Sequence, residues 1–144
     1  MRGLLLDTNV LSEMGSKRPD IAVMRWLSKV DPVDFYTSTI VIGEIIYGVT
    51  RIPDSPRKER LNLWLEHIEI KFDGRILSFD EESARIWGIL KAQLESLGLA
   101  RPLIDLQIAA TALRHGLPVV TRNTKHFEGL GLVVINPWSH KSAS

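Results

Sequence analysis

The chain has 144 residues, enough for one domain with a substantial hydrophobic core. Its net charge of +1, with 44% hydrophobic and 24% charged residues, is typical of globular proteins and excludes a global electrostatic attraction to nucleic acid or membranes. The absence of cysteine excludes disulfide scaffolds, thiolate zinc sites and cysteine nucleophiles, and no apolar segment has the length of a signal peptide or membrane span. We therefore expect a soluble, cytoplasmic, single-domain protein.

The first predicted element is a short strand, Leu4 to Leu6, that runs directly into Asp7. Three consecutive leucines indicate a strand buried on both faces, as in a parallel sheet covered by helices. Such sheets bind ligands where the carboxyl ends of the strands release the chain. Asp7 is therefore the first candidate for a functional residue.

The segments that follow alternate between helical and strand patterns. Apolar spacing, N-capping residues and proline or glycine stops predict helices near residues 10–14, 19–30 and 39–51, from 56, and near 80–97 and 103–115. Short strands are expected at 34–38, 75–79, 117–121 and 132–135. This alternation predicts a three-layer α/β/α fold with a central, mostly parallel sheet of about five short strands. Residues 1–138 would form one domain and 139–144 a C-terminal tail.

One of these helices carries a continuous apolar stripe. The helix after Asp80 is expected to bury Ile86, Trp87, Leu90, Leu94 and Leu97. Asp80 itself would cap the helix, and Gly98 would end it.

A second acidic residue, Glu44, lies in the middle of the helix predicted at 39–51. Its neighbours between residues 40 and 49 are mostly isoleucine and valine, so the carboxylate is expected to be at least partly buried. A buried carboxylate has to be paired, protonated or bound to a metal ion. In the alternative interpretation, Glu44 lies on a narrow exposed stripe with Gly48 and Arg51.

A third acidic residue, Asp105, lies near the start of an apolar helix. Aspartate at that position commonly caps a helix or interacts with its dipole, so a structural role is one interpretation. The same helix leads to the strand at 117–121, which is expected beside the first strand. Thr121 and Asn123 would then flank Asp7 at the carboxyl edge of the sheet.

Five short motifs occur in order along the chain. They are Leu5-Leu6-Asp7-Thr8-Asn9, Glu44 followed by Tyr47-Gly48, Leu103-Ile104-Asp105 with Ile108-Ala109-Ala110, Thr121-Arg122-Asn123 with Phe127, and Asn136-Pro137-Trp138. Together they resemble the PIN-domain ribonucleases, and among these the VapC and FitB type of bacterial toxin. The resemblance extends over residues 1–138.

The resemblance implies a metal-dependent endoribonuclease toxin that hydrolyses RNA phosphodiester bonds with a metal-activated water. Asp7, Glu44 and Asp105 would be the catalytic acids and would bind Mg²⁺ or Mn²⁺, Glu44 either directly or through a water. Asn123 occupies a fourth ligand position that many relatives fill with aspartate, and it supplies no charge. Hard divalent cations prefer such oxygen ligands and activate bound water.

Supporting residues and partners also follow from the resemblance. Asn9 and Thr121 would hold the acidic cluster and its waters in place. The chain would form a homodimer. A cognate antitoxin of the VapB or FitA type would cover the acidic groove, and operator DNA would be bound only through that antitoxin.

Basic residues near the acids are candidates for binding RNA phosphates. The segment after the Glu44 helix supplies Arg51, Arg57 and Lys58, and Arg122 follows a strand. The histidines show no metal-ligand spacing and are expected mostly at the surface or at helix ends. They are His67, His115, His126 and His140.

Two other functions are compatible with these residues. A phosphatase on a similar α/β sheet would use Asp7 as its nucleophile, but such enzymes usually have a second aspartate where this chain has Asn9. A non-catalytic binding module would retain the PIN fold without cleaving RNA. The intact set of three acids argues against that module.

Overall fold

The computed structural model describes residues 3–140, which contain five short strands and six α-helices. The strands are β1 (Leu4–Leu6), β2 (Phe35–Ser38), β3 (Ile76–Leu77), β4 (Val119–Val120) and β5 (Val134–Ile135). The helices are α1 (Thr8–Met14), α2 (Ile21–Ser28), α3 (Thr39–Thr50), α4 (Pro56–Lys71), α5 (Glu81–Ser96) and α6 (Leu103–His115). Single 3₁₀ turns occupy Pro32–Asp34, Thr124–His126 and Pro137–His140. Most of the tail expected at 139–144 lies outside the described residues.

The sheet is parallel throughout and has the strand order β3-β2-β1-β4-β5. The chain first adds strands on one side of β1 and later continues on the other side, so the winding reverses between β1 and β4. Ligands of open α/β sheets bind at the carboxyl ends of the strands where such a reversal occurs. Asp7 follows β1 and Thr121 follows β4, which places both residues at this crevice.

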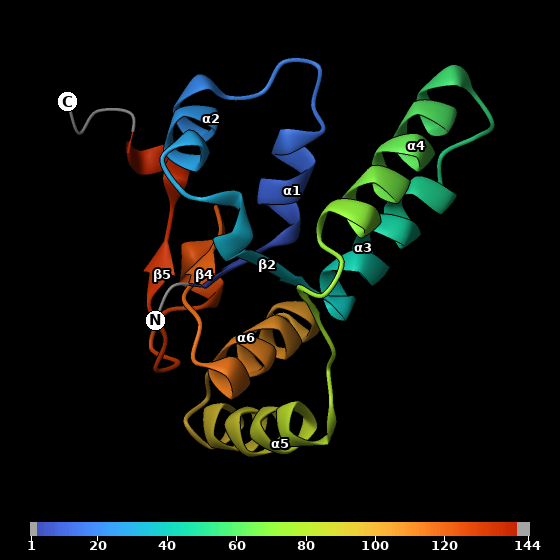
Figure 1. Cartoon of the computed structure of the whole chain (residues 1–144). Coiled ribbons are helices and arrows are strands. Elements are labelled where there is room, and N and C mark those ends of the chain that lie inside the picture. The colour runs from blue at the N-terminus through green and yellow to red at the C-terminus, as the bar shows by residue number, and fades with distance from the viewer. Residues whose placement is uncertain (1–2, 141–144) are drawn as a thin grey trace.

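Helices cover both faces of the sheet, as Figure 1 shows. α1 and α2 lie on one side of the strands, and α6 lies on the other with α5 packed against it. α3 and α4 lie side by side and project beyond the sheet. The predicted α/β/α fold with about five parallel strands is therefore confirmed. Within residues 3–140, no helix combines the length and apolar character needed to cross a bilayer.

Helix ends follow local side-chain chemistry. Ser38 Oγ accepts a hydrogen bond from the Val41 N–H at the start of α3, and Asp80 caps α5 in the same way. Gly116 ends α6 with a φ of 66°, in the left-handed region that favours glycine. The predicted helices agree with the structure to within a few residues. Strands were predicted too long, because only two residues each of 75–79 and 117–121 pair as strand in β3 and β4.

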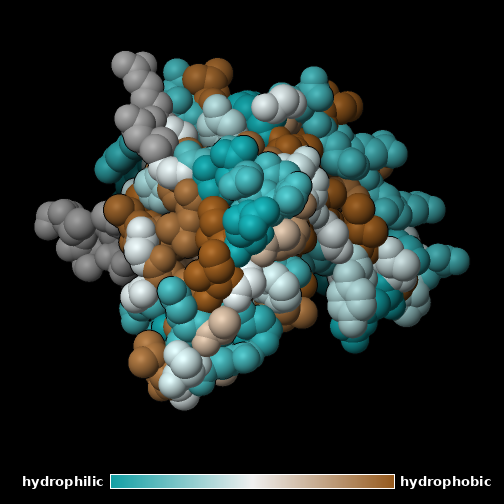
Figure 2. Space-filling model, turned by 90° about the horizontal axis from the view of Figure 1, so that it is seen from below, coloured by the Kyte–Doolittle hydropathy of each residue, from teal (hydrophilic) through white to brown (hydrophobic). Residues whose placement is uncertain are grey.

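The core lies between the strands and the inner helix faces, where Leu5, Leu6 and Val120 are fully buried. The predicted stripe of α5 is wrong at Leu97, which is 71% exposed because the helix ends at Ser96. Ile89 and Leu103 of the same helical layer are also exposed. Figure 2 views the molecule from below and shows apolar side chains gathered in one part of this face, bordered by hydrophilic ones.

Candidate active site

Asp7 is held rigidly at the carboxyl end of β1. Its Oδ1 accepts a hydrogen bond from the Thr8 N–H at 2.7 Å, and its Oδ2 accepts one from the Thr121 hydroxyl at 2.7 Å. Asn9 Nδ2 lies 3.4 Å from Asp7 Oδ2 and 3.3 Å from Thr121 Oγ1. Asn9 and Thr121 therefore lie where the sequence predicted them, on either side of a carboxylate that is only 2% exposed.

Burial makes the charge on Asp7 costly. It raises the pKa of Asp7 from 3.8 to about 6, and the hydrogen bonds from Thr121 and Thr8 only partly oppose this rise. The negative charges of Asp105 and Glu44 raise the pKa further. The three acids consequently repel one another, as expected for carboxylates that face a common space without a compensating cation.

Glu44 reaches the same region from α3. Its Oε1 accepts a hydrogen bond from the Thr8 hydroxyl at 2.5 Å, and the residue is half-buried, as predicted. Thr8 thus contacts two of the three acids, because its backbone N–H binds Asp7 and its hydroxyl binds Glu44. The alternative of an exposed Glu44 beside Arg51 does not describe this arrangement.

Asp105 lies in the first turn of α6 and is buried. It does not cap the helix, since the N-cap position is Pro102, which offers no side-chain hydrogen bond. Instead, Asp105 Oδ2 lies 2.5 Å from His126 Nδ1. The His126 ring is 40% exposed and so lies at the surface, as expected of most of the histidines, but it also contacts a candidate site acid, which the sequence did not indicate.

The three acids line one cavity of about 510 Å³. Asn123, at the proposed fourth ligand position, lines it too, and its backbone N–H donates to Thr121 Oγ1. Arg122 and Trp138 form another part of the wall. The guanidinium carbon of Arg122 lies 5.3 Å from the centre of the Trp138 ring, which is a cation–π contact.

The predicted RNA-binding cations are distributed unevenly. Arg122 lines the acidic cavity, and Arg57 lines the cavity next to it. Arg51 instead packs over the Tyr47 ring, and Lys58 donates to the Thr50 carbonyl and pairs with Asp54. The structure therefore brings Arg122 and Arg57 to the site, whereas Arg51 and Lys58 are engaged elsewhere.

The donor set suits a hard divalent cation, because carboxylate and amide oxygens are the ligands that Mg²⁺ and Mn²⁺ prefer. Three carboxylates and the Asn123 amide face one cavity. Among residues 3–140, however, no three acidic or histidine side chains already converge on one point at metal-binding distance. The residues that line the cavity fit a divalent metal ion in donor chemistry and charge.

Fold and site together define an α/β protein with an acidic, oxygen-rich crevice at the carboxyl edge of a parallel sheet. The family model described as the PIN domain matches residues 4–131. Because this match spans most of the chain, the protein belongs to the PIN-domain family, as the motifs indicated.

Individual relatives agree with this assignment. The VapC ribonuclease Y4jK of Sinorhizobium fredii and the toxin FitB of Neisseria gonorrhoeae are each 38% identical over 136 residues, covering 94% of this chain and 97% and 98% of theirs. Two solved structures, FitAcB from Neisseria gonorrhoeae and FitAB bound to an IR36 DNA fragment, superpose with a TM-score of 0.87. Their identities are 38% and 37%, over 94% of this chain and 98% and 95% of theirs.

Proposed function

We propose that this protein is an endoribonuclease toxin that hydrolyses RNA phosphodiester bonds with the help of Mg²⁺ or Mn²⁺. The observation that carries the proposal is the meeting of Asp7, Glu44 and Asp105, from three distant parts of the sequence, around one cavity at the carboxyl edge of the sheet. The names of two relatives, one a ribonuclease and the other a toxin, support the same activity.

In this proposal the three acids would hold the cation, with Asn123 as a neutral fourth donor. When bound, the cation would activate a water and neutralise charge that develops on the phosphate. The chain's own residues fix the acids: Thr8 binds both Asp7 and Glu44. Because Asn123 adds no charge, the site carries at most three negative charges, and RNA phosphates would meet less repulsion than at a four-acid site.

Arg122 has a separate role in this scheme. It lines the acidic cavity and packs over Trp138, which restricts the guanidinium to the cavity wall. Its backbone N–H also donates to Asn9 Oδ1 at 3.1 Å, so the segment is fixed relative to α1. A guanidinium held in this way can bind a substrate phosphate and orient the strand across the acids.

The partners follow from the relatives. The solved relatives include a FitAB complex on DNA. We expect this chain to bind a cognate antitoxin that covers the acidic cavity and carries the binding to operator DNA. We also expect a homodimer, for which the exposed apolar side chains of the α5–α6 layer offer a contact surface. The expected location is the cytoplasm.

The two rival functions receive less support. A phosphatase of that kind usually has a second aspartate two residues after the nucleophile, where this chain has Asn9. Asn9 cannot act as the accompanying acid and instead contacts Asp7. A binding module without catalysis would not require three mutually repelling carboxylates at one crevice.

The test is cleavage of a mixed cellular RNA by the purified full chain with Mg²⁺ or Mn²⁺. Asp105→Asn keeps the shape of the side chain and removes its charge, so we expect cleavage to fall by more than about 100-fold, beyond the 10–100-fold typical of groups that only orient metal ligands. Asp73→Asn, at an exposed position, is the matched control and should cleave like the parent. An inactive parent, or an Asp105→Asn protein with parental activity, would overturn the proposal.

A further inference from the structure

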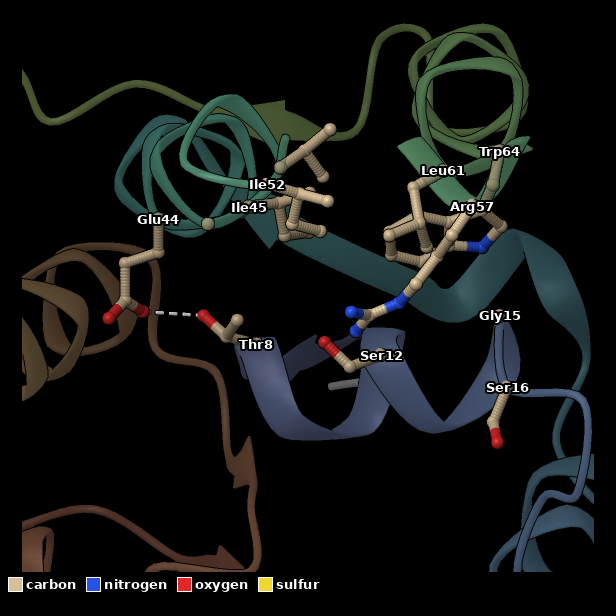
Figure 3. Close-up of a pocket in the computed structure, with 12 residues that line it drawn as sticks. Thr8, Ser12, Gly15, Ser16, Glu44, Ile45, Ile52, Arg57, Leu61 and Trp64 are labelled. Atoms are coloured by element: carbon tan, nitrogen blue, oxygen red, sulfur yellow. Dashed lines mark hydrogen bonds between the residues drawn. The ribbon is translucent and has the colours of Figure 1, made fainter. Parts of the chain in front are cut away.

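A second cavity, of about 420 Å³, adjoins the acidic one between α1 and the α3–α4 pair (Figure 3). The two cavities share four lining residues: Thr8, Ser12, Ser16 and Glu44. Because Thr8 and Glu44 border both cavities, an RNA strand bound at the acids would lie next to the second cavity. Its volume falls within the roughly 300–1,000 Å³ typical of small-molecule sites.

The walls of this cavity are mainly apolar. Ile45 and Val49 contribute from α3, and Leu61 and Trp64 from α4. The Trp64 ring lies against Gly15 so closely that a Cβ there would be 2.5 Å from Trp64 Cε2. The indole is thus held at the end of α1, and an apolar slot with an aromatic wall suits the face of a nucleobase.

The cavity also contains a cation. Figure 3 shows the Arg57 side chain reaching from α4 across the cavity toward Ser12. In the described part of the chain, Arg57 makes no hydrogen bond or ion pair, unlike its neighbour Lys58, which pairs with Asp54. A guanidinium without a partner inside the protein is available to an external anion, and a phosphate is the anion that RNA supplies.

A third cavity, of about 530 Å³, lies on the other side of Glu44 and provides a comparison. It is lined by Thr39, Ile40, Gly43, Glu44, Tyr47 and Ile104, and therefore by no cationic side chain. The cavity with Arg57 combines an apolar wall with a phosphate-binding group, and the lining of this third cavity does not. Arg51 lies beside this third cavity but packs over the Tyr47 ring, whereas Arg57 has no partner among the described residues, and this difference favours the α1 side for the RNA strand.

We propose that the cavity between α1 and the α3–α4 pair binds the nucleotide next to the scissile phosphate. The base lies against the apolar wall at Trp64, and its phosphate pairs with Arg57. This inference rests on the proposed ribonuclease function and adds to it a substrate subsite.

Filling the cavity is the first test. Gly48 lines it, and apart from the backbone of its own helix and its two chain neighbours, no atom of residues 3–140 lies within 4 Å of the position that a Cβ would take. Gly48→Leu therefore starts its side chain in open space. Gly88→Leu, at an equally open position on α5, is the matched control. Both changes are made in full-length Asp7→Asn protein, so that RNA is bound but not cleaved, and thermal unfolding confirms that each variant folds.

The probe is a fluorescein-labelled, random-sequence, single-stranded RNA decamer, and its Kd is measured by anisotropy. We expect Gly48→Leu to raise the Kd about 5-fold or more, since base stacking on an aromatic side chain is worth at least that much in single-strand binding. Gly88→Leu should leave the Kd unchanged. Unchanged RNA affinity in Gly48→Leu would overturn the subsite.

The phosphate contact is tested separately by salt dependence. Arg57→Ala should weaken binding and lower the slope of log K against log salt by about 0.7, the value for one phosphate contact of a single strand. Arg60→Ala, exposed on the same helix and outside the cavity, should change the slope less. Equal slopes for Arg57→Ala and the Asp7→Asn protein would remove the phosphate contact from the proposal.

Two further readouts separate the hypotheses. Cleavage of RNA by the chain with an intact Asp7 tests the ribonuclease activity, and an inactive parent counts against the proposed function. Unchanged RNA binding in Gly48→Leu counts against the subsite alone. If Gly48→Leu, on the active background, escapes neutralisation by the cognate antitoxin while its RNA affinity is unchanged, the cavity serves a protein partner, and the nucleotide subsite is overturned.

Discussion

Among single residues, Asp7 carries the largest electrostatic cost. Burial raises its pKa from 3.8 to about 6, so between these values the folded protein binds a proton that the unfolded chain releases. Its contribution to stability is therefore fully present below about pH 4 and is lost as the pH rises through 6, a loss of about 3 kcal/mol without metal. We expect metal-free Asp7→Asn protein to lack this loss.

The measurement is urea unfolding in EDTA between pH 4 and pH 7, with the parent and Asp7→Asn compared at each pH. Acids away from the site contribute equally to both proteins, so the difference between the two free energies of unfolding reports Asp7 together with its coupling to Asp105 and Glu44. That difference should move in favour of Asp7→Asn as the pH rises. Parallel pH profiles would show that Asp7 is not buried as the structure describes.

The contact of His126 with Asp105 assigns the histidine a testable role in holding a candidate metal ligand. Its Nδ1 lies 2.5 Å from Asp105 Oδ2, which fixes the orientation of this carboxylate toward the cavity. His126→Phe should therefore weaken Mn²⁺ binding about 10–100-fold, as is usual when a partner of a metal ligand is removed, and His126→Asn should weaken it less. Isothermal titration gives the affinity, with exposed His67→Phe as control. Unchanged Mn²⁺ affinity in His126→Phe would leave the contact without a functional role.

The sequence predicted part of this site for a clear reason. Asp7 and Thr121 each end a buried apolar strand, and strands of a parallel sheet present their carboxyl ends at one edge, so their proximity follows from pattern alone. The contact between His126 and Asp105 has no such signal. It depends on how the 3₁₀ turn after β4 packs beside α6, and neither the spacing of 21 residues nor the residue types determine that packing.

Among the secondary-structure elements, α3 shows how a local cap supports the site. Ser38 is fully buried. At the start of the helix that carries Glu44, its Oγ accepts a hydrogen bond of 3.1 Å from the Val41 N–H. Ser38→Ala would leave this N–H unsatisfied and should cost about 1–2 kcal/mol of stability. Chemical denaturation measures the change. Ser28→Ala, on the exposed end of α2, should stay within about 0.5 kcal/mol, and an equal loss in both would exclude the cap as the cause.

Helices were predicted more accurately than strands because their signals are local. The start of α4 is marked by two adjacent residues, the N-cap Ser55 and Pro56 at the first helical position, and the end of α6 is marked by Gly116. The extent of a strand depends instead on its neighbours. β3 pairs only with β2, at the edge of the sheet, so just Ile76 and Leu77 have strand partners although the predicted segment was longer.

For the whole molecule, the site joins parts of the chain that are far apart in sequence. Asp7 follows the central strand β1, and Glu44 lies on α3, which projects from the sheet. Asp105 lies on α6, on the side of the sheet away from α1 and α2. Their mutual repulsion opposes the assembly of these parts in the absence of a cation. A cation that binds all three would therefore stabilise the fold as a whole, and the effect would be visible in global unfolding.

The size of this stabilisation follows from binding linkage. A metal ion at a hundredfold excess over its Kd adds about 2.7 kcal/mol when it binds only the folded chain, which corresponds to several degrees in Tm for a domain of this size. We expect Mn²⁺ and Mg²⁺ to raise the Tm of the parent in a calorimetric scan and to have little effect on Asp7→Asn or Asp105→Asn. Asp73→Asn, which changes the net charge equally at an exposed position, should respond like the parent. If its metal response were lost as well, the stabilisation would reflect general charge screening, and the three acids would not form a shared metal site.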